Sequence, residues 1–183
     1  GRIGKLALRP LLDQGADIAF INDAVGDPAM HAHLLEFDSV HGRWPAAFSA
    51  DEGAITIDGQ RIPVTSTRTL ADLPLDGVDV VIDCTGAFKT QAALAPYFAA
   101  GVKKVVVSAP VKDGPTANIV YGVNDTIYDP DLHQIITAAS CTTNCLAPVV
   151  KVLLEGIGIK HGSITTIHDV TNTQTIVDRP AKD

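Results

Sequence analysis

Short apolar runs rich in β-branched residues alternate along the chain with segments rich in alanine and leucine. Several runs are almost continuously apolar, which is typical of strands covered by helices on both faces of a sheet. The predicted strands are Ile18–Asn22, Val78–Asp83, Lys104–Ser108, Ile119–Gly122, Gln134–Ala138 and Ser163–His168. This alternation predicts an α/β fold with a mainly parallel sheet.

Two of the intervening segments, residues 1–12 and 90–101, predict helices. The second has Gly101 at its end, which is a common residue just past a helix C-terminus. In the first, the apolar residues that share one predicted helical face are Ile3, Leu6, Ala7 and Leu11.

Residues 53–64 interrupt the alternation, and we interpret them as a β-hairpin inserted into the α/β pattern. The dipeptide Asp58-Gly59 is a strong signal for a two-residue hairpin turn. The alternating apolar residues on its two sides are Ile55, Ile57, Ile62 and Val64. Because proline has no N–H to donate to a neighbouring strand, Pro63 predicts that its strand lies at a sheet edge.

Composition excludes several classes of partner. The 183 residues are 46% hydrophobic with a net charge of −7, enough for one domain, or for one domain and part of another. Charges of both signs are scattered, so we expect no nucleic acid partner. No apolar run reaches the roughly 18 residues of a membrane span. Three unevenly spaced cysteines do not make a disulfide framework, so we expect a cytoplasmic protein.

The chain starts at Gly1, inside an apparent motif, and its last residues show no stop pattern. We therefore expect it to be part of a longer protein and to be inactive by itself. There is no charged and apolar leader at its start, so we expect no export signal.

The sequence "GRIG" at residues 1–4 matches the last two glycines of a G-x-G-x-x-G turn. A helical pattern follows it, and Asp23 stands nineteen residues after Gly4 at the end of a predicted strand. In a dinucleotide site the glycines allow close approach of the pyrophosphate, and the acid binds the ribose hydroxyls. Asp23 would repel a 2′-phosphate, which favours NAD over NADP. The alternative is that these are ordinary turn glycines and Asp23 merely ends a strand.

Two further segments favour the dinucleotide interpretation. Thr85 and Gly86 in "DCTGAF", and Ser108 in "VSAP", directly follow predicted strands. Ligands bind outside the carboxyl ends of strands in open α/β sheets. The sequence therefore predicts a Rossmann-type sheet, although each segment taken alone is also ordinary loop chemistry.

Cys141 lies at the start of a predicted helix that Gly156 closes, with Ser140 as a candidate N-cap. Free amides and the positive end of the helix dipole there favour thiolate over thiol. His168, twenty-seven residues later near the end of a predicted strand, is a candidate base for this thiol. From the residues alone, Cys141 is either a nucleophile or a buried structural thiol.

The other cysteines and histidines give weaker evidence of function. Cys145 and Cys84 are interpreted as packing residues. A redox pair of Cys141 and Cys145 is a weaker alternative, because the two do not form a Cys-x-x-Cys motif. No zinc pattern or other metal set is present, so we expect no metal.

Taken in order, "GRIG", "IND", "DSVHG", "CTGAF", "SAP", "SCTTNCLAP" and "TTIH" resemble the phosphorylating glyceraldehyde-3-phosphate dehydrogenase family over essentially the whole chain. The resemblance implies an NAD-binding domain at residues 1–139, lacking its first strand, and the beginning of an α+β catalytic domain at residues 140–183. It also implies glyceraldehyde 3-phosphate and inorganic phosphate as substrates, NAD as cofactor and a homotetramer at full length.

The resemblance further implies residue roles. Cys141 would be the nucleophile and form a thioester that phosphate cleaves, with His168 as its base. The positions that match substrate or phosphate contacts are Ser140, Thr142 and Thr171. The positions expected to contact the cofactor, from the motifs and the resemblance together, are Gly1, Arg2, Ile3, Gly4, Asp23, Arg68, Thr85, Gly86 and Ser108.

Some residues depart from the family pattern. Asp169-Val170 follows His168 where the family usually has a small residue and then an aromatic one, and "TNTQ" stands where "TNDQ" is usual. These departures, with "EFDSVHGRW", resemble the branch associated with arsenate resistance, in which arsenate would be the attacking oxyanion. Erythrose-4-phosphate dehydrogenase is another alternative with a poorer match. A non-catalytic nucleotide-binding module and a thiol-redox protein are the alternatives from other classes.

Overall fold

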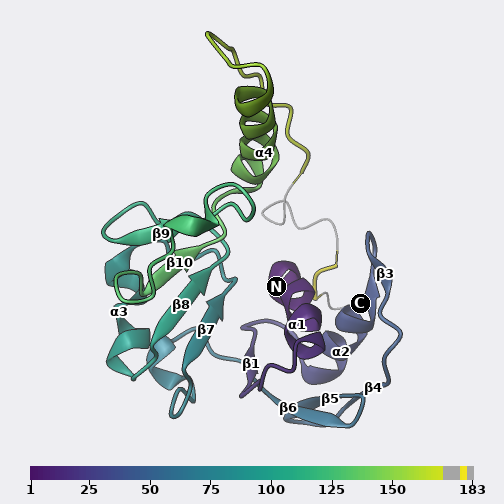
Figure 1. The fold of residues 1–183 in the computed structure, drawn as a ribbon. Coiled ribbons are helices and arrows are strands. Elements are labelled where there is room, and N and C mark those ends of the chain that lie inside the picture. Colours follow the sequence, from purple (N-terminus) through teal and green to yellow (C-terminus); the bar gives the residue numbers. More distant parts are fainter. Residues whose placement is uncertain (171–177, 181–183) are drawn as a thin grey trace. The chain divides into compact units, whose positions relative to one another are not determined.

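The structure, a computed structural model, describes residues 1–170 and 178–180 of the chain. The described chain forms two compact units, one comprising Gly1–Leu75 with the C-terminal segment Val170–Asp183, the other Asp76–Asp169. The predicted domain boundary after residue 139 lies inside the second unit, so the two units do not test it and it stays a prediction. Figure 1 shows that helices and strands alternate over much of the chain. The predicted α/β class is confirmed.

The first unit contains a mixed sheet in the strand order β1-β6-β5-β4. Only β1 and β6 run parallel, and β4, β5 and β6 form an antiparallel meander. Its helices are α1 (Arg2–Asp13) and α2 (Pro28–Glu36). Its strands are β1 (Ile21–Asn22), β4 (Phe48–Ala50), β5 (Ala54–Ile57) and β6 (Gln60–Thr65), with a small separate pair, β2 (Phe37–Asp38) and β3 (Gly42–Arg43). A 3₁₀ turn, Leu70–Asp72, follows.

The predicted hairpin is confirmed as β5 and β6. Asp58 and Gly59 both have positive φ, 48° and 85°, which two-residue turns with the twist of a hairpin require. The prediction that Pro63 marks an edge strand is wrong, since β6 lies between β1 and β5. Pairing with β1 begins only at Val64. The side of β6 to which an N–H of residue 63 would point therefore has no strand beside it at Pro63, and the missing donor leaves no ladder hydrogen bond unmade.

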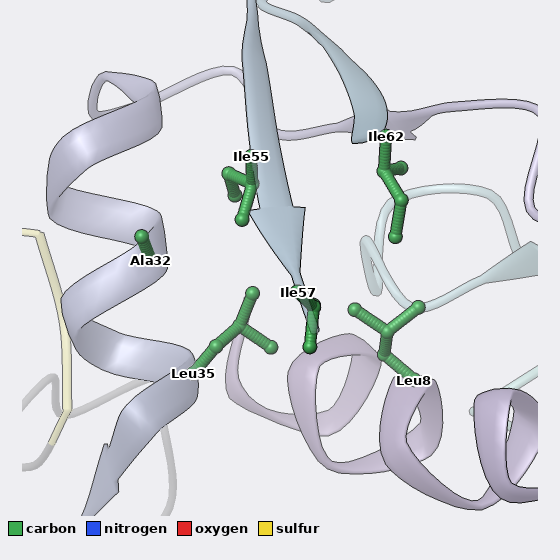
Figure 2. Packing of buried hydrophobic residues seen from close by; sticks show 6 residues of the cluster. All are labelled: Leu8, Ala32, Leu35, Ile55, Ile57 and Ile62. Atoms are coloured by element: carbon green, nitrogen blue, oxygen red, sulfur yellow. The ribbon is translucent and has the colours of Figure 1, made fainter. Parts of the chain in front are cut away.

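The core of the first unit forms between the hairpin and the two helices (Figure 2). Its fully buried members are Leu8, Ala32, Leu35, Ile55, Ile57 and Ile62. The inward face of α1 is centred on Leu8, with Leu12 packed against the cluster. Of the predicted face, Leu6, Ala7 and Leu11 are half-buried, and Ile3 is 50% exposed. Burying each large aliphatic side chain contributes about 1.5–3 kcal/mol, so this cluster stabilises the unit.

The second unit contains a fully parallel sheet in the order β7-β8-β10-β9. Its strands are β7 (Val80–Asp83), β8 (Lys104–Val107), β9 (Thr116–Asn118) and β10 (Ile135–Thr137). Its helices are α3 (Gln91–Ala99) and α4 (Cys141–Gly156), with a 3₁₀ turn at Asp125–Ile127. Gly101, with a φ of +97°, follows the end of α3 as predicted.

Two strand predictions in this unit are wrong. The strand expected at Ile119–Gly122 is β9, at Thr116–Asn118, and the chain turns at 121–124. Thr116 and Asn118 are polar, so the hydrophobic pattern does not indicate this strand. In the structure, Thr116 Oγ1 and Asn118 Nδ2 both donate to the Val111 carbonyl. Ser163–His168 is an exposed segment without strand pairing in the described structure. Apolar alternation alone does not make a strand when no neighbouring strand supplies hydrogen bonds.

Candidate active site

Cys141 is the first residue of α4, directly after the turn that follows β10. Ser140 is the N-cap, as predicted, and its Oγ accepts a hydrogen bond of 3.0 Å from the Thr143 amide. A hydroxyl at this position satisfies one of the free amides of the first turn. The Cys141 thiol therefore lies at the positive end of the α4 dipole and is exposed to solvent.

His168 meets the thiol although no strand carries it. Its Nε2 lies 3.2 Å from Cys141 Sγ, and its Nδ1 lies 2.7 Å from the Asp169 carbonyl oxygen. A carbonyl only accepts, so Nδ1 carries a proton in this arrangement. In the neutral ring Nε2 is then left free to accept the thiol proton.

The pKa values of the pair move toward each other. The hydrogen bond with His168, helped by the Thr142 amide, lowers the pKa of the Cys141 thiol. The bond to the Asp169 carbonyl, and then the Cys141 sulfur, raise the pKa of His168. Both shifts favour a thiolate beside an imidazolium, which is the reactive form of a cysteine nucleophile.

The other two cysteines have different surroundings. Burial raises the pKa of the Cys84 thiol, despite a hydrogen bond with Ser108. Cys145 is exposed, so its assignment to packing is wrong, because the face of α4 that carries it is uncovered in the described structure. All three cysteines are free thiols.

The first group of predicted cofactor residues lies in the first unit. Gly1 caps α1, with Arg2, Ile3 and Gly4 in its opening turn. Asp23, directly after β1, lies 3.6 Å from Nζ of Lys5 in the first turns of α1, and the terminal amino group of this sequence, on Gly1, also contacts its carboxylate. The structure thus brings the acid at the end of β1 to the glycine turn, as the spacing predicts. The amides of the first turn of α1 are the donors that a phosphate would use, and the role of the glycine turn stays a prediction.

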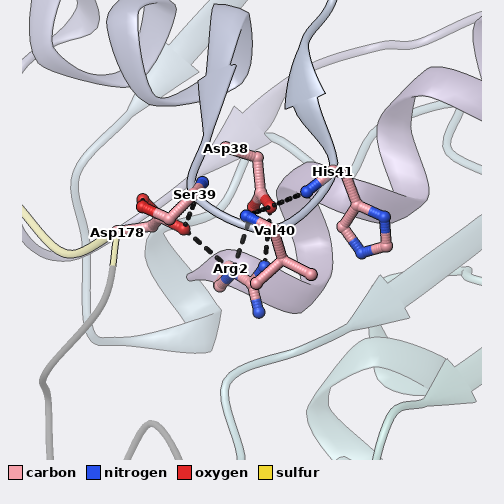
Figure 3. A network of polar contacts seen from close by, with 6 residues as sticks. All are labelled: Arg2, Asp38, Ser39, Val40, His41 and Asp178. Carbon is pink, nitrogen blue, oxygen red and sulfur yellow. Dashed lines mark hydrogen bonds and ion pairs between the residues drawn. The ribbon is translucent and has the colours of Figure 1, made fainter.

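The Arg2 side chain is held by two carboxylates (Figure 3). Its guanidinium donates to both oxygens of Asp38, at 2.7 and 3.0 Å, and to Asp178 at 3.1 Å. The Val40 and His41 amides also donate to Asp38, and with the Arg2 guanidinium they hold the pKa of that carboxyl far below its usual range. The Arg2 side chain is thus engaged within the first unit, and its role in cofactor binding stays a prediction.

The second group lies in the second unit, around the end of β7. Asp83, 2% exposed, accepts from the Thr85 amide at 2.9 Å and from the Thr85 hydroxyl at 2.7 Å. Tyr97 of α3 donates to the other Asp83 oxygen at 3.1 Å. The neighbouring Gly86 has a φ of +68° and open space above it. These contacts fix the backbone of the predicted ligand loop in advance.

The remaining predicted residues are less informative. Ser108 follows β8, and its amide donates to the Asp83 carbonyl at 2.9 Å. Thr142 is half-buried in the first turn of α4, and Arg68 is exposed in a bend of the first unit. Thr171 lies outside the described residues. The individual roles of all these residues stay predictions.

The sequence motifs did not single out Asn144, whose side-chain amide donates to the carbonyls of Ala138 and Ser140. The signal available was an asparagine inside a helix, a position that asparagine disfavours unless its side chain bonds to nearby backbone.

Among residues 1–170 and 178–180, no cluster of three or more histidine, cysteine or carboxylate side chains is arranged to hold a metal ion. In the same part of the chain, no helix is both long and apolar enough to cross a membrane.

In the second unit, the parallel sheet with its prearranged loop after β7 is typical of an α/β nucleotide-binding protein. In the first unit, so is the glycine turn with an acid beside it, and the thiol–imidazole pair of the second unit adds a reactive cysteine. Comparison with known families agrees. "Glyceraldehyde 3-phosphate dehydrogenase, NAD binding domain" matches residues 1–91, and the C-terminal domain of the same family matches residues 140–183. The chain belongs to the phosphorylating glyceraldehyde-3-phosphate dehydrogenase family, whose cofactor is NAD.

Relatives with high identity support this assignment. The chain is 54% identical to glyceraldehyde-3-phosphate dehydrogenase 3 of Nostoc sp. and 50% identical to the enzyme of Streptomyces coelicolor, in both cases over 100% of the chain and 55% of the relative. It is 44% identical to a protein of Chondrus crispus named as the cytosolic enzyme, over 99% of the chain. The chain thus spans about half the length of the curated relatives it matches.

Proposed function

We propose that the full-length protein oxidises glyceraldehyde 3-phosphate with NAD and inorganic phosphate, through a thioester on Cys141. The observation that carries the proposal is the 3.2 Å contact between Cys141 Sγ and His168 Nε2 at the start of α4. A thiolate beside an imidazolium is suited to attack an aldehyde carbon, and the ring is suited to return a proton.

In the proposed reaction the Cys141 thiolate forms a bond to the aldehyde carbon, and His168 supplies a proton to the resulting oxyanion. Bound NAD would supply the acceptor for the hydride of that carbon. His168 holds the hydroxyl proton that leaves as the thioester carbonyl forms. A phosphate oxygen then attacks the carbonyl carbon, the C–S bond breaks, and Cys141 is regenerated as thiolate.

The residues that would hold NAD are the glycine turn at Gly1 and Gly4, the carboxylate of Asp23, and the loop at Thr85 and Gly86. A Cβ at Gly86 would meet no atom within 4 Å beyond its chain neighbours, so the backbone of this loop is open to a ligand. Replacing Asp23 by Ala should weaken NAD binding about tenfold and relax the discrimination against NADP, because the acid no longer binds the ribose hydroxyls or repels a 2′-phosphate. Titration of both cofactors measures this, and an unchanged preference would show that Asp23 only ends β1.

The Ser140 and Thr142 hydroxyls, with Thr171, are proposed to bind the substrate or the attacking oxyanion. Arsenate has the shape and charge of phosphate, so this site would accept either ion. The Asp169 carboxylate beside His168 adds a negative charge near the base, in the segment that departs from the family pattern. Steady-state kinetics with phosphate and arsenate side by side, with product capture, would identify the physiological oxyanion.

The central test compares two cysteines in the full-length protein. Cys141→Ala should lower kcat at least about 10³-fold while the Kd for NAD stays within about twofold. Cys84→Ala, the matched control, should keep turnover. NADH formation and NAD titration measure the two quantities. Turnover that survives in Cys141→Ala would discard the mechanism and favour a nucleotide-binding module with a structural thiol.

We further propose that the full-length protein acts as a homotetramer in the cytoplasm. The cytoplasmic assignment agrees with the name of the Chondrus crispus relative. Sedimentation of the purified protein tests the tetramer.

A further inference from the structure

The turn between β10 and α4 contains a backbone conformation that its sequence disfavours. Ala139 has a φ of +54° and is 6% exposed. Left-handed backbone brings the Cβ of an L-residue close to a carbonyl oxygen, and alanine has no polar side chain that could compensate. The other non-glycine residues with positive φ in the described structure, Asp58 and Asp178, belong to a type that tolerates it better. An outlier of this kind persists only where its surroundings hold it.

Side chains on both sides hold this turn. Thr137 Oγ1, in β10, accepts a hydrogen bond of 3.1 Å from the Ala139 amide. Asn144, one turn into α4, donates to the Ala138 carbonyl at 2.7 Å and to the Ser140 carbonyl at 2.9 Å. Every residue of the turn therefore has a backbone group bound by a side chain from outside it.

The strand side of this arrangement is anchored in the core. Thr137 is completely buried, and its hydroxyl donates to Asn118 Oδ1 at 2.6 Å. Asn118, at the end of β9, donates through Nδ2 to the carbonyl of the buried Val111 at 3.0 Å. Because the hydroxyl proton goes to Asn118, the oxygen of Thr137 is left to accept from Ala139.

Cys141, the first residue of α4, lies two residues after Ala139, so the φ of Ala139 sets the direction in which α4 leaves the sheet. We propose that Thr137 and Asn144 are positioning residues for the nucleophile, which hold the left-handed turn so that Cys141 Sγ meets His168 and the Thr142 amide. This inference rests on the proposed function, in which Cys141 is the nucleophile. Neither positioning residue touches the sulfur; both act through the backbone of the turn.

The test uses matched variants of the full-length protein. Thr137→Val keeps the shape of the side chain and removes the hydroxyl, whereas Thr137→Ser keeps the hydroxyl. The rate of iodoacetamide labelling is measured at Cys141 by peptide mass spectrometry over a range of pH, with Cys84 in the same sample as internal reference. Thr137→Val should raise the pH midpoint of labelling by about one unit and lower the rate at pH 7 about tenfold. Thr137→Ser should stay within about twofold of the wild type.

Steady-state kinetics provide a second readout. Thr137→Val should lower kcat about tenfold and leave the KM for NAD within about twofold, because the cofactor-binding loop is not part of this arrangement. A loss confined to thermal stability, with the pH midpoint and kcat unchanged, would mean that the turn is only a chain connection.

Asn144→Ala decides the question if Thr137→Val fails to fold, since Asn144 is exposed. It should slow labelling of Cys141 by several-fold. Glycine adopts positive φ without a steric penalty, so adding Ala139→Gly to Asn144→Ala should restore at least half of the lost rate. A wild-type rate no higher than that of a free thiol would overturn the proposed function and this inference with it. A fast wild-type rate that both Thr137→Val and Asn144→Ala leave unchanged overturns this inference alone.

Discussion

Cys84 and Cys141 both lie beyond the carboxyl ends of strands in one parallel sheet, and the pKa values of their thiols shift in opposite directions. Each follows the carboxyl end of a strand, β7 for Cys84 and β10 for Cys141, and both strands pair with β8. Burial raises the pKa of the Cys84 thiol, and His168 lowers the pKa of the Cys141 thiol. A position beyond a strand end is therefore not enough to activate a cysteine.

The polar groups around the two thiols account for the difference. Beside Cys84, a hydrogen bond with Ser108 is outweighed by burial, and the buried Asp83 carboxylate takes its hydrogen bonds from Thr85 and Tyr97, which hold the loop. Beside Cys141, the helix start and His168 direct donors at the sulfur itself. The first region is built to fix a backbone, and the second to stabilise a negative charge.

Removing the imidazole of His168 should reduce the difference in reactivity between Cys141 and Cys84 more than any other change. In the full-length protein, His168→Ala should lower turnover about 10²-fold or more, because the thiol loses its base and its hydrogen-bonded cation. Labelling of Cys141 by iodoacetamide at pH 7 should fall toward that of a free thiol, while labelling of Cys84 stays unchanged. Kinetics and peptide mass spectrometry on one sample measure both effects. Equal rates for Cys141 before and after the substitution would remove His168 from the mechanism.

The pH dependence of iodoacetamide labelling should show the difference in pKa between the two thiols directly. A thiol reacts as thiolate, so a lowered pKa moves the midpoint of the rate profile to lower pH. The Cys141 midpoint should lie below the value of about 8.5 for a free thiol, and the Cys84 midpoint above it. In His168→Ala the Cys141 midpoint should move up. Coincident profiles for the two cysteines in the wild type would contradict the electrostatic account of the site.

Much of this contrast could be predicted from the sequence. The helix start at Ser140 and Cys141, the hairpin turn at Asp58-Gly59 and the meeting of Asp23 with the glycine turn follow from local rules of capping, turn chemistry and spacing. These rules act over a few residues, or over one strand–helix unit, so the sequence carries them directly.

What could not be predicted depends on partners distant in the sequence. β9 was misplaced because Thr116–Asn118 becomes a strand by pairing with β10, about twenty residues later, and its polar side chains give no apolar pattern. Pro63 was misassigned because nothing in the sequence says where β1 begins beside β6. The left-handed Ala139 was not predicted either, because Thr137, which binds its amide, is itself fixed by Asn118, nineteen residues away.

The smallest expected effect concerns the region of Cys84. Tyr97 is buried and donates to the Asp83 carboxylate, and burial together with that carboxylate raises the pKa of its hydroxyl. Tyr97→Phe removes a hydrogen bond to a buried charge and should lower the free energy of unfolding by about 2 kcal/mol in urea titrations. Labelling of Cys84 should rise several-fold as its loop opens more often, and labelling of Cys141 should not change.

Tyr121→Phe makes the same chemical change at a side chain that is 89% exposed, and should stay within about 0.5 kcal/mol of the wild type. Because the raised pKa keeps the proton on Tyr97 in the folded state after the unfolded chain has lost it, wild-type stability should fall as pH rises above about 10. Tyr97→Phe should lose that part of the pH dependence, and Tyr121→Phe should retain it. If the two variants lose stability equally, the Asp83–Tyr97 contact does not hold the loop after β7, and the difference between the two thiol regions must come from the Cys141 side alone.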